Sequence, residues 1–505
     1  MYCKLYCAML TGLEALPVVV EADAANGMPM FSIVGHVSTQ VKEAQERVRT
    51  ALKNISVVMP PKRITVNLSP GDVRKEGTRF DLPIAAGVLG AIGRIDAKAL
   101  SGVMVLGELH LDGSVGKISG VLPSVICAKE AGCRACIVPA ANRREAEIVG
   151  EIPVIGIRTL SELVDFCETG TLPAGGEENI HGQKKKREAA LPDFSDIRGQ
   201  PSVKRCALIA AAGFHNMLMT GPPGSGKSMA ARRLPGIMPD LSEDEKLELS
   251  KIYSIAGLLP EEEPLFSGRP FRAPHHSLTA AALCGGGKYP RPGEITLAHR
   301  GVLFLDELPE MKRNVLEMLR QPLEDRCIRI SRQSGSFLFP ASFLLVGAMN
   351  PCPCGHYPDR TRCRCSREEI RAYKNRISRA LMDRIDIQCE ILAVSYDDLS
   401  GEKTDEISSS VLKKQVDAAF AVQKERYRGT EIHFNSEIGS SEIGKYCPVT
   451  EKGEKLLRTM FGRMGLSARG YHHVLRVART IADLDREEMI GERHISEALC
   501  YRTGL

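Results

Sequence analysis

The amino-acid sequence predicts an α/β protein in three parts: an N-terminal α/β domain, a core built on a parallel sheet, and a helical C-terminal part. Three observations predict this fold class. Residues 1–170 alternate strand-like and helix-like segments. The middle of the chain contains short apolar runs that end in polar residues, as buried parallel strands do. From residue 397 onward, apolar positions recur at helical spacing.

The elements follow in chain order from these patterns. In the N-terminal part we expect strands at 64–68, 102–106 and 135–138, and helices at 41–55 and 83–89. The expected core strands are 216–220, 302–305 and 343–346. The expected C-terminal helices are 409–426, 454–464 and 470–484.

Composition limits the possible classes of protein. A chain of 505 residues is too long for a single core and suggests about three domains. A hydrophobic content of 43% and a charged content of 26% are typical of a soluble globular protein. The net charge of +5 is small for this length, so any surface that binds nucleic acid must be local. No apolar run is long enough to span a bilayer.

The beginning of the chain resembles a secretion signal, but charged residues interrupt it. Glu14 divides the apolar segment and Glu21 follows it, so we expect two strands there instead. Sixteen cysteines without a secretion signal predict a reducing, cytoplasmic compartment in which thiols are free or bound to metal.

A polar segment is expected to separate two domains. Residues 171–191 lack periodicity and contain Gly175-Gly-Glu-Glu178, which is typical of a flexible linker. The run Lys184-Lys-Lys-Arg-Glu188 could contact DNA, although such a run more often belongs to a solvated linker. The predicted domain boundaries are 1–170, 171–191, 192–396 and 397–505.

The segment Gly221-Pro-Pro-Gly-Ser-Gly-Lys-Ser228 fits the P-loop pattern and lies between an expected strand and an expected helix. Its glycines allow backbone N–H groups to surround phosphate oxygens, and the helix N-terminus adds positive potential. Lys227 would reach the β- and γ-phosphates of a nucleoside triphosphate, and Ser228 would hold Mg²⁺. The predicted nucleotide-binding residues are Gly221, Pro222, Pro223, Gly224, Ser225, Gly226, Lys227, Ser228 and Asp306.

Asp306 and Glu307 follow an apolar strand downstream of the P-loop, as a Walker B pair does. Asp306 would bind the hydration shell of Mg²⁺, and Glu307 would orient and deprotonate the attacking water. Asn350 ends the next strand, where its amide could hold that water or contact the γ-phosphate. Because Pro351 follows, a strand-end turn explains Asn350 equally well.

Longer motifs around these residues resemble the magnesium-chelatase-like AAA+ family. They are Asp193-Phe-Ser-Asp-Ile-Arg-Gly-Gln200, Phe271-Arg-Ala-Pro-His-His-Ser277, Gly285-Gly-Gly287 and Pro292-Gly-Glu-Ile-Thr-Leu-Ala-His-Arg-Gly-Val-Leu-Phe-Leu-Asp-Glu-Leu308. Within that family, the layout is similar to the YifB/ComM proteins over nearly the whole chain. The resemblance implies an AAA+ P-loop core with a C-terminal helical lid, ATP and Mg²⁺ as ligands, a homo-hexameric ring, DNA as a partner and no membrane association.

The resemblance also implies an arginine finger. The segment Ser378-Arg-Ala-Leu-Met-Asp-Arg-Ile-Asp386 is similar to the one that carries it, so the finger would be Arg384. It would act on the nucleotide of a neighbouring subunit, which requires a ring. The alternative is a structural salt bridge from Arg384 to Asp383 or Asp386.

A second arginine matches the family's sensor-2 position. The segment Ser467-Ala-Arg469 implies that Arg469 reaches the γ-phosphate from the helical lid. Arg476, one to two helical turns further along the chain, is a rival for this role.

The family pattern implies two insertions. One runs over 271–297, within the helix that follows the P-loop strand, and the other is a hairpin around 330–336. Because related ring motors use such loops to line a pore, Lys288, Arg291 and Arg332 are candidate contacts to a DNA backbone. Exposed surface charge explains each of them equally well. We interpret His275-His276 as structural, because no metal-ligating partner lies nearby in the sequence.

Cys352-Pro-Cys354 and Cys363-Arg-Cys365 could place four thiolates around one tetrahedral Zn²⁺. The usual zinc knuckle has two residues between its cysteines, so four free thiols are the alternative. Residues 360–379 contain eight Lys or Arg and two Glu, which would suit a contact to nucleic acid.

Residues 1–170 resemble the Lon-protease-like domain, which has an α/β fold like that of ribosomal protein S5, over 64–87 and 105–139. That protease uses a Ser–Lys dyad. Where the nucleophile would fall, this chain reads Lys75-Glu-Gly-Thr-Arg-Phe-Asp-Leu-Pro83, which contains no serine. Where the lysine would fall, it reads Ile118-Ser-Gly-Val-Leu122, which contains no lysine. Because acyl-enzyme chemistry needs the hydroxyl and its base, we predict a non-proteolytic domain.

Three functions therefore compete. They are an ATP-driven DNA helicase for branched or single-stranded DNA in recombination, a chelatase motor subunit that drives metal insertion, and a Lon-like protease. The missing dyad disfavours the protease, and the fused N-terminal domain disfavours the chelatase subunit. We expect the helicase.

Overall fold

The computed structural model describes residues 1–170, 192–287, 290–332, 335–392 and 407–502. The expected linker at 171–191 and Lys288 lie outside these residues. By contacts, the chain divides into two compact units. Unit 1 comprises Met1–Lys186, Glu243–Ser267 and Ser331–Leu338, and unit 2 comprises Arg187–Ser242, Gly268–Ile330 and Phe339–Leu505. The mixed α/β class is confirmed, whereas the domain boundaries given above stay predictions.

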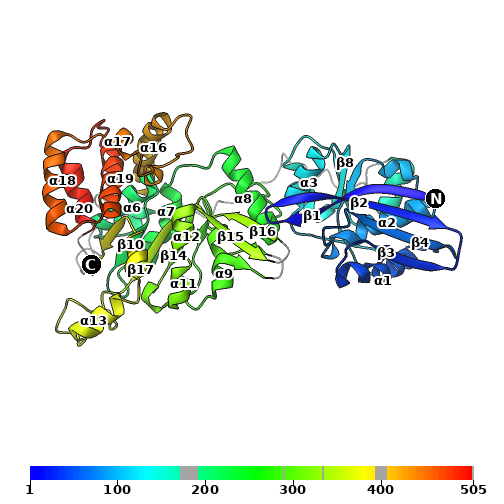
Figure 1. The fold of residues 1–505 in the computed structure, drawn as a ribbon, viewed down its shortest axis with the longest axis horizontal. Helices are drawn as coiled ribbons and strands as arrows, with labels where there is room; N and C mark the ends of the chain where they lie inside the picture. Colours follow the sequence, from blue (N-terminus) through cyan, green and yellow to red (C-terminus); the bar gives the residue numbers. More distant parts are fainter. Residues whose placement is uncertain (171–191, 288–289, 333–334, 393–406, 503–505) are drawn as a thin grey trace. The chain divides into compact units, whose positions relative to one another are not determined.

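Unit 1 is built on a seven-stranded sheet in the order β3-β4-β2-β1-β5-β8-β9 (Figure 1). The strand pairs β1–β2 and β2–β4 are antiparallel, and the other neighbours are parallel. Strands β1 and β2 are the two strands that were expected at the start of the chain. The strands are β1 (Tyr2–Thr11), β2 (Glu14–Ala25), β3 (Met30–Val34), β4 (Arg63–Ser69), β5 (Val103–Val105), β8 (Ala135–Pro139) and β9 (Val154–Ile157), with a separate hairpin of β6 (Glu108–Leu109) and β7 (Val115–Gly116).

Helix α2 occupies the centre of unit 1. All of its residues are buried, because its sequence is apolar on every side after Asp81. The Asp81 carboxylate lies 2.7 Å from Nε of Arg47 on α1, which offsets the cost of burying the charge. The helices of unit 1 are α1 (Thr39–Asn54), α2 (Asp81–Ala91), α3 (Val121–Glu130), α4 (Arg143–Glu147), α5 (Leu160–Thr169) and α8 (Glu243–Ala256).

Helix α8 comes from the middle of the chain yet packs against α3. The backbone N–H of Gly120 donates to the carbonyl of Ser254 on α8, at 2.9 Å. The buried Glu145 carboxylate accepts from the Ser254 hydroxyl and from the backbone N–H of Leu122. This segment was expected in the ATPase core, and no local sequence pattern indicates its contacts with α3.

Unit 2 is built on a five-stranded parallel sheet in the order β11-β14-β17-β10-β18. The three expected core strands are present, and Figure 1 shows them side by side. Because the strands are parallel, the segments that follow them meet at one edge of the sheet, here called the carboxyl edge. The strands are β10 (Met217–Thr220), β11 (Phe271–Arg272), β14 (Val302–Leu305), β17 (Leu344–Met349) and β18 (Ile387–Glu390).

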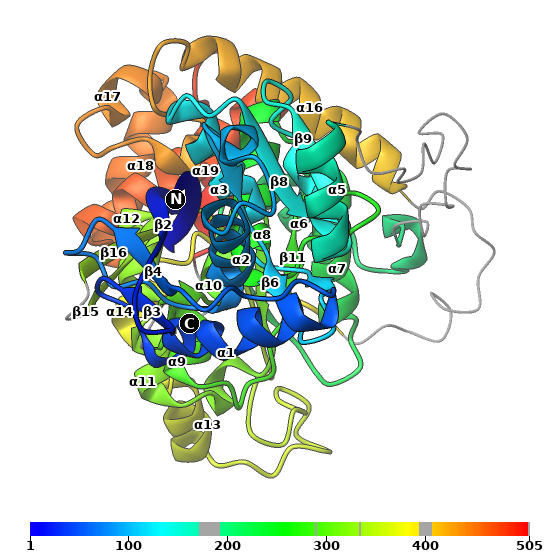
Figure 2. The ribbon, with the colours of Figure 1, turned by 90° about the vertical axis from the view of Figure 1, so that its right-hand side faces the viewer.

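Helices surround this sheet and form the C-terminal part of unit 2. Figure 2 shows α16, α18 and α19 close together, and α16 and α19 both contact α6. Helices α16, α18 and α19 match the three expected C-terminal helices. The helices are α6 (Pro201–Gly213), α7 (Lys227–Ile237), α9 (Ala280–Cys284), α10 (Glu294–Leu297), α11 (Arg313–Glu317), α12 (Arg320–Asp325), α13 (Arg367–Lys374), α14 (Arg379–Met382), α16 (Ser409–Arg426), α17 (Ile443–Tyr446), α18 (Glu451–Met464), α19 (Ala468–Leu484) and α20 (Glu492–Cys500). Among the described residues, no helix is both long and apolar enough to cross a membrane.

The expected insertion at 271–297 begins later than predicted. Phe271–Arg272 forms β11, an edge strand of the main sheet, because the segment is extended and pairs with Val302–Leu303. The inserted part is the short hairpin of β12 (Gly285–Gly286) and β13 (Arg291–Pro292), which lies between α9 and α10. The second expected hairpin consists of β15 (Cys327–Arg332) and β16 (Gly335–Pro340).

Candidate nucleotide-binding site

The P-loop connects β10 to α7 at the carboxyl edge of the sheet. Gly224 and Gly226 have φ of +76° and +91°, which residues with a side chain rarely adopt. At Gly221, a Cβ atom would lie 2.6 Å from the carbonyl oxygen of Ile391, so the loop passes too close to the backbone for a larger residue. The backbone N–H groups of the loop and the N-terminus of α7 therefore converge on a single anion-binding position.

Lys227 bonds within its own loop. Its Nζ donates to the carbonyls of Gly221 at 2.7 Å and Pro222 at 2.9 Å, and it lies 3.3 Å from Oδ1 of Asn350. Burial lowers the pKa of Lys227, and the charges of Asp306 and Glu307 oppose this change. The oxygens that accept hydrogen bonds from this ammonium are all neutral, so a bound polyanion would stabilise its charge further.

Two further groups fit a bound phosphate and its metal ion. The hydroxyl of Ser225 is buried and has no hydrogen-bond partner among the described residues. The hydroxyl of Ser228 donates to Oδ2 of Asp306 at 3.0 Å. A hydroxyl beside a carboxylate is the oxygen donor set that Mg²⁺ prefers.

His276 contacts Glu307, a pairing that the sequence analysis missed. Its Nδ1 lies 3.0 Å from Oε2 of Glu307, and its ring lies against that of His275 with centroids 4.1 Å apart. The two partners meet because β11 and β14 are parallel neighbours, so the segments after them reach the same edge. Recognition of β11 as a strand would have revealed this proximity.

Arg384 and Arg469 form a separate cluster around Glu324 of α12. Nη2 of Arg384 lies 2.5 Å and Nη2 of Arg469 lies 2.7 Å from the same atom, Oε1 of Glu324. The hydrogen bond from Arg384 holds the pKa of Glu324 below its usual value against the effect of burial, and both arginine charges add to this. The observed ion pair of Arg384 is therefore with Glu324, and not with Asp383 or Asp386 as the structural alternative supposed.

This arginine cluster lies at the opposite end of the sheet from the P-loop. Arg384 precedes β18, whose first residue pairs with the first residue of β10, whereas the P-loop follows the last residue of β10. The backbone N–H of Asp386 donates to the carbonyl of Asn216 at this amino end. Burial lowers the pKa of Arg476, and the charge of the nearby Asp386 opposes this change. Lys227 and Asn350 are therefore in contact, whereas Arg384, Arg469 and Arg476 do not contact either of them.

The four cysteines of the segment 352–365 come together. Their sulfur atoms all lie within 4.8 Å of one another, so this cluster could bind a metal ion such as Zn²⁺. The backbone N–H of His356 and the Cys352 thiol lower the pKa of Cys354 to about 6, which favours its thiolate. The loop also touches the P-loop, since a Cβ on Gly355 would lie 2.8 Å from Cδ of Pro223.

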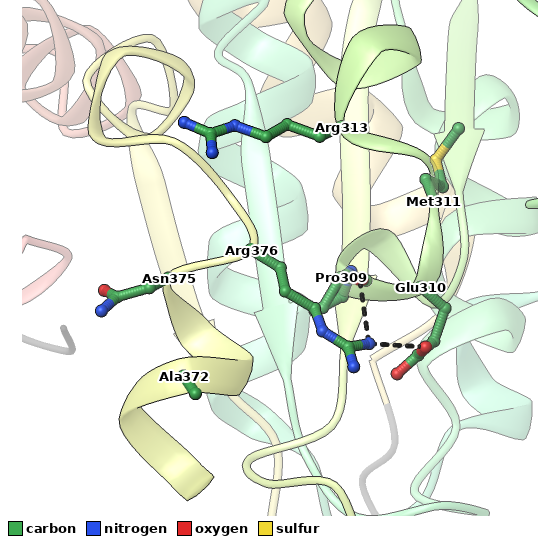
Figure 3. Close-up of a pocket in the computed structure, with 7 residues that line it drawn as sticks. All are labelled: Pro309, Glu310, Met311, Arg313, Ala372, Asn375 and Arg376. Carbon is green, nitrogen blue, oxygen red and sulfur yellow. Dashed lines mark hydrogen bonds and ion pairs between the residues drawn. The ribbon is translucent and has the colours of Figure 1, made fainter. Parts of the chain in front are cut away.

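A pocket of about 390 Å³ lies beside the nucleotide site and not within it (Figure 3). In Figure 3, Arg376 reaches from the end of α13 to the turn after Walker B, where it bonds to Glu310 at 2.7 Å. The P-loop residues do not line this pocket. Its lining residues are Pro309, Glu310, Met311, Arg313, Ala372, Asn375 and Arg376.

The two described candidates for DNA contact lie on hairpins. Arg291 is exposed on β13 and belongs to unit 2. Arg332 is exposed at the end of β15 and belongs to unit 1. The basic segment 360–379 continues from the cysteine loop, and most of its arginines are exposed.

Three family models match successive parts of the chain. "Magnesium chelatase, subunit ChlI" matches residues 193–399, "Subunit ChlI of Mg-chelatase" matches 20–142, and "Magnesium chelatase, subunit ChlI C-terminal" matches 406–502. The matches therefore extend over most of both compact units.

Two of three individual relatives match along nearly the whole chain, and the third matches about a third of it. The competence protein ComM of Haemophilus influenzae is 41% identical over 97% of this chain and 95% of its own length. The uncharacterized protein YifB of Escherichia coli is 39% identical with the same coverage of both chains. The magnesium-chelatase 38 kDa subunit of Rhodobacter capsulatus is 27% identical over 31% of this chain and 50% of its own length.

Proposed function

We propose that this chain, which belongs to the YifB/ComM family of magnesium-chelatase-like ATPases, is a ring-forming AAA+ motor that hydrolyses ATP to move DNA. The observation that carries the proposal is the meeting of Lys227, Asp306, Glu307 and Asn350 at the carboxyl edge. Such a set binds a nucleotide and activates water.

Each residue of this set has a separate task. Lys227 exchanges its loop carbonyls for the β- and γ-phosphates, and Ser228 and Asp306 hold the Mg²⁺ that accompanies them. Bound Mg²⁺ supplies positive charge to the phosphate oxygens. Glu307 accepts a proton from the attacking water, and Asn350 holds that water or the γ-phosphate.

Arg384 serves a neighbouring subunit. Strand β10 has four residues and spans about 13 Å, which exceeds the length of an arginine side chain. Arg384 therefore cannot reach the phosphates of its own P-loop from the other end of that strand. Because Arg469 shares Glu324 with it, both arginines are assigned to the same subunit interface of a homo-hexamer.

Local basic groups support DNA as the substrate. Arg291 and Arg332 can bind the phosphates of a DNA backbone, which is a contact that does not depend on base sequence. The relative in Haemophilus influenzae is named a competence protein, which fits helicase or branch-migration activity in recombination and natural transformation. We assign those roles to this chain as part of the same proposal.

DNA-stimulated ATP hydrolysis tests the function. The hydrolysis rate should rise with single-stranded or branched DNA, and strand displacement should differ among forked, three-way and four-way substrates. Arg291→Ala should reduce the salt slope of single-strand binding by about 0.7, the value for one lost phosphate contact. Arg428→Ala, which removes an exposed arginine that lies 3.9 Å from Glu425, is the matched control.

The alternative is a chelatase-type motor that acts through a partner protein. The descriptions of the three matching family models favour it. If DNA leaves the hydrolysis rate unchanged while a tetrapyrrole-chelatase partner raises it, the chelatase-type motor replaces the DNA motor as the assigned function. A rate that rises with a protein substrate alone would instead indicate a remodelling factor.

We also propose that residues 1–170 form a Lon-protease-like, S5-type domain without peptidase activity. Arg79 lies in the segment where the nucleophile would fall, and its Nη1 donates to the hydroxyl of Ser124 at 3.2 Å. A guanidinium stays protonated and cannot act as the base for a serine. Absence of peptide cleavage with ATP present is the expected result.

A further inference from the structure

The loop that follows Asn350 has little apolar material to hold it. Residues 351–366 contain no helix or strand, and the cluster of buried apolar side chains there contains Cys352, Cys363 and Ile370, with Cys365 against it. A segment with so small a core needs a covalent or metal staple to keep one conformation.

The sulfur positions fit a metal ion. A tetrahedral zinc site with Zn–S bonds of about 2.3 Å requires neighbouring sulfurs about 3.8 Å apart. Sγ of Cys352 lies 3.4 Å from that of Cys354 and 3.7 Å from that of Cys363. A backbone N–H of Tyr357 also points to Sγ of Cys352 at 3.4 Å, a contact that stabilises a metal-bound thiolate.

The loop connects this cluster to the nucleotide site. Asn350, which contacts Lys227, is two residues before Cys352 in the chain. Gly355 lies so close to the side chain of Pro223 that any larger residue at position 355 would collide with the Pro223 ring.

We propose that Cys352, Cys354, Cys363 and Cys365 bind one Zn²⁺, and that the zinc-stapled loop holds Asn350 and the P-loop in the arrangement that binds nucleotide. The zinc site stands on the sulfur geometry alone. Its effect on nucleotide binding rests on the proposed ATPase function. The staple therefore acts as a structural support for the nucleotide site and takes no part in the chemistry.

Metal content of the full-length chain tests the first half. Protein purified under reducing conditions without added metal should contain one zinc per chain by mass spectrometry, and a mercurial thiol reagent should release it. Cys363→Ser should lower the content to a small fraction, whereas Cys133→Ser, a partly exposed thiol of unit 1, should leave it unchanged. Iron, no metal, or disulfides among these four cysteines would overturn the zinc site.

Nucleotide affinity tests the second half. Cys354 is the exposed ligand, so Cys354→Ser should preserve the fold, lose zinc and weaken binding of a fluorescent ATP analogue about tenfold, equivalent to about 1.4 kcal/mol. Cys354→His, which restores a zinc ligand, should recover both zinc and affinity. Unchanged affinity in zinc-free Cys354→Ser would overturn the coupling, while failure of the wild-type protein to bind ATP would overturn the ATPase proposal and leave the zinc result intact.

Discussion

At the residue scale, Lys227 and Glu307 separate binding from hydrolysis. Lys227→Ala should abolish ATP binding, because no other ammonium group contacts the described P-loop carbonyls. Glu307→Gln should retain ATP binding and lose hydrolysis, since an amide cannot accept the proton of the attacking water. Equilibrium binding and single-turnover assays distinguish the two. Rapid turnover by the Glu307→Gln chain would assign the base to another residue.

His276 provides a second residue-scale prediction. Its imidazole lies 3.0 Å from Glu307 and so competes with a water for that carboxylate. His276→Ala should raise the DNA-free hydrolysis rate by up to about tenfold, as a charged hydrogen bond of about 1.5 kcal/mol is removed. The matched control is His275→Ala, whose ring bonds to Ser277 at 2.8 Å. A fall in rate for His276→Ala alone would show that His276 positions Glu307 for catalysis.

Glu324 is expected to hold Arg384 until a neighbouring nucleotide replaces it. Glu324→Gln should weaken the ion pair at 2.5 Å without changing equilibrium binding of ATP. The readout is the concentration dependence of hydrolysis, which reports on contact between subunits. Glu317→Gln, on the neighbouring helix α11, is the control because Glu317 pairs with Arg320 instead. Equal effects of the two changes would remove the special role of Glu324.

The P-loop could be assigned from sequence alone, because the spacing of its residues along the chain is itself the signal, and their role in nucleotide binding stays a prediction. It did not predict His276 or Glu324 as partners. Those two residues meet Glu307 and Arg384 through strand order and helix packing, which no local pattern reveals. His275 and His276 were therefore interpreted as structural, and a carboxylate on α12 was not considered.

At the element scale, a buried polar network joins Asp386, the residue before β18, to α19. Oδ2 of Asp386 accepts from the backbone N–H of Asn216 at 3.0 Å, and its Oδ1 contacts His473 of α19. His215 lies 3.6 Å from the same carboxylate and bonds to Thr480 at 2.7 Å. The helical part is thereby attached to the sheet through charges as well as through apolar packing.

This network predicts a pH dependence of stability. Burial opposes ionisation of Asp386, but the charge and the hydrogen bond of His473, together with the nearby His215, outweigh it and hold the pKa of Asp386 well below its ordinary value. A carboxyl whose pKa is lowered in the folded state stabilises that state at pH values above its pKa in the unfolded chain, which is near 3.8. This stabilisation is lost as the pH falls below that value. Asp386→Asn should therefore lower the melting temperature at pH 7, with a difference that shrinks below about pH 4. A difference independent of pH would contradict the ionised network.

Most elements were predictable because continuous apolar runs identify buried parallel strands. β10, β14 and β17 lie where those runs occur. β11 was missed because its two residues, Phe271–Arg272, are too few to show any periodicity. Its partner strand determines its conformation, so the neighbouring histidines were assigned to an insertion.

At the scale of the whole molecule, the chain order and the packing order differ. Glu243–Ser267 follows the P-loop helix in sequence but belongs to unit 1 through α8. Ser254→Leu would remove the hydroxyl that donates to Glu145 and leave this buried carboxylate without one partner. We expect a loss of thermal stability that Lys251→Ala, a change on the same helix, does not cause. Equal melting temperatures would contradict a structural role for this contact.

The central claim is that each ATPase site combines the P-loop of one subunit with Arg384 of the next. Mixing a Lys227→Ala chain with an Arg384→Ala chain tests it most directly, since each chain alone should be inactive. In randomly mixed rings, about a quarter of the interfaces would pair an intact P-loop with an intact Arg384, so hydrolysis should return to roughly that fraction of the wild-type rate. No recovery in rings shown to contain both chains, or hydrolysis at the wild-type rate by the Arg384→Ala chain alone, would contradict the claim.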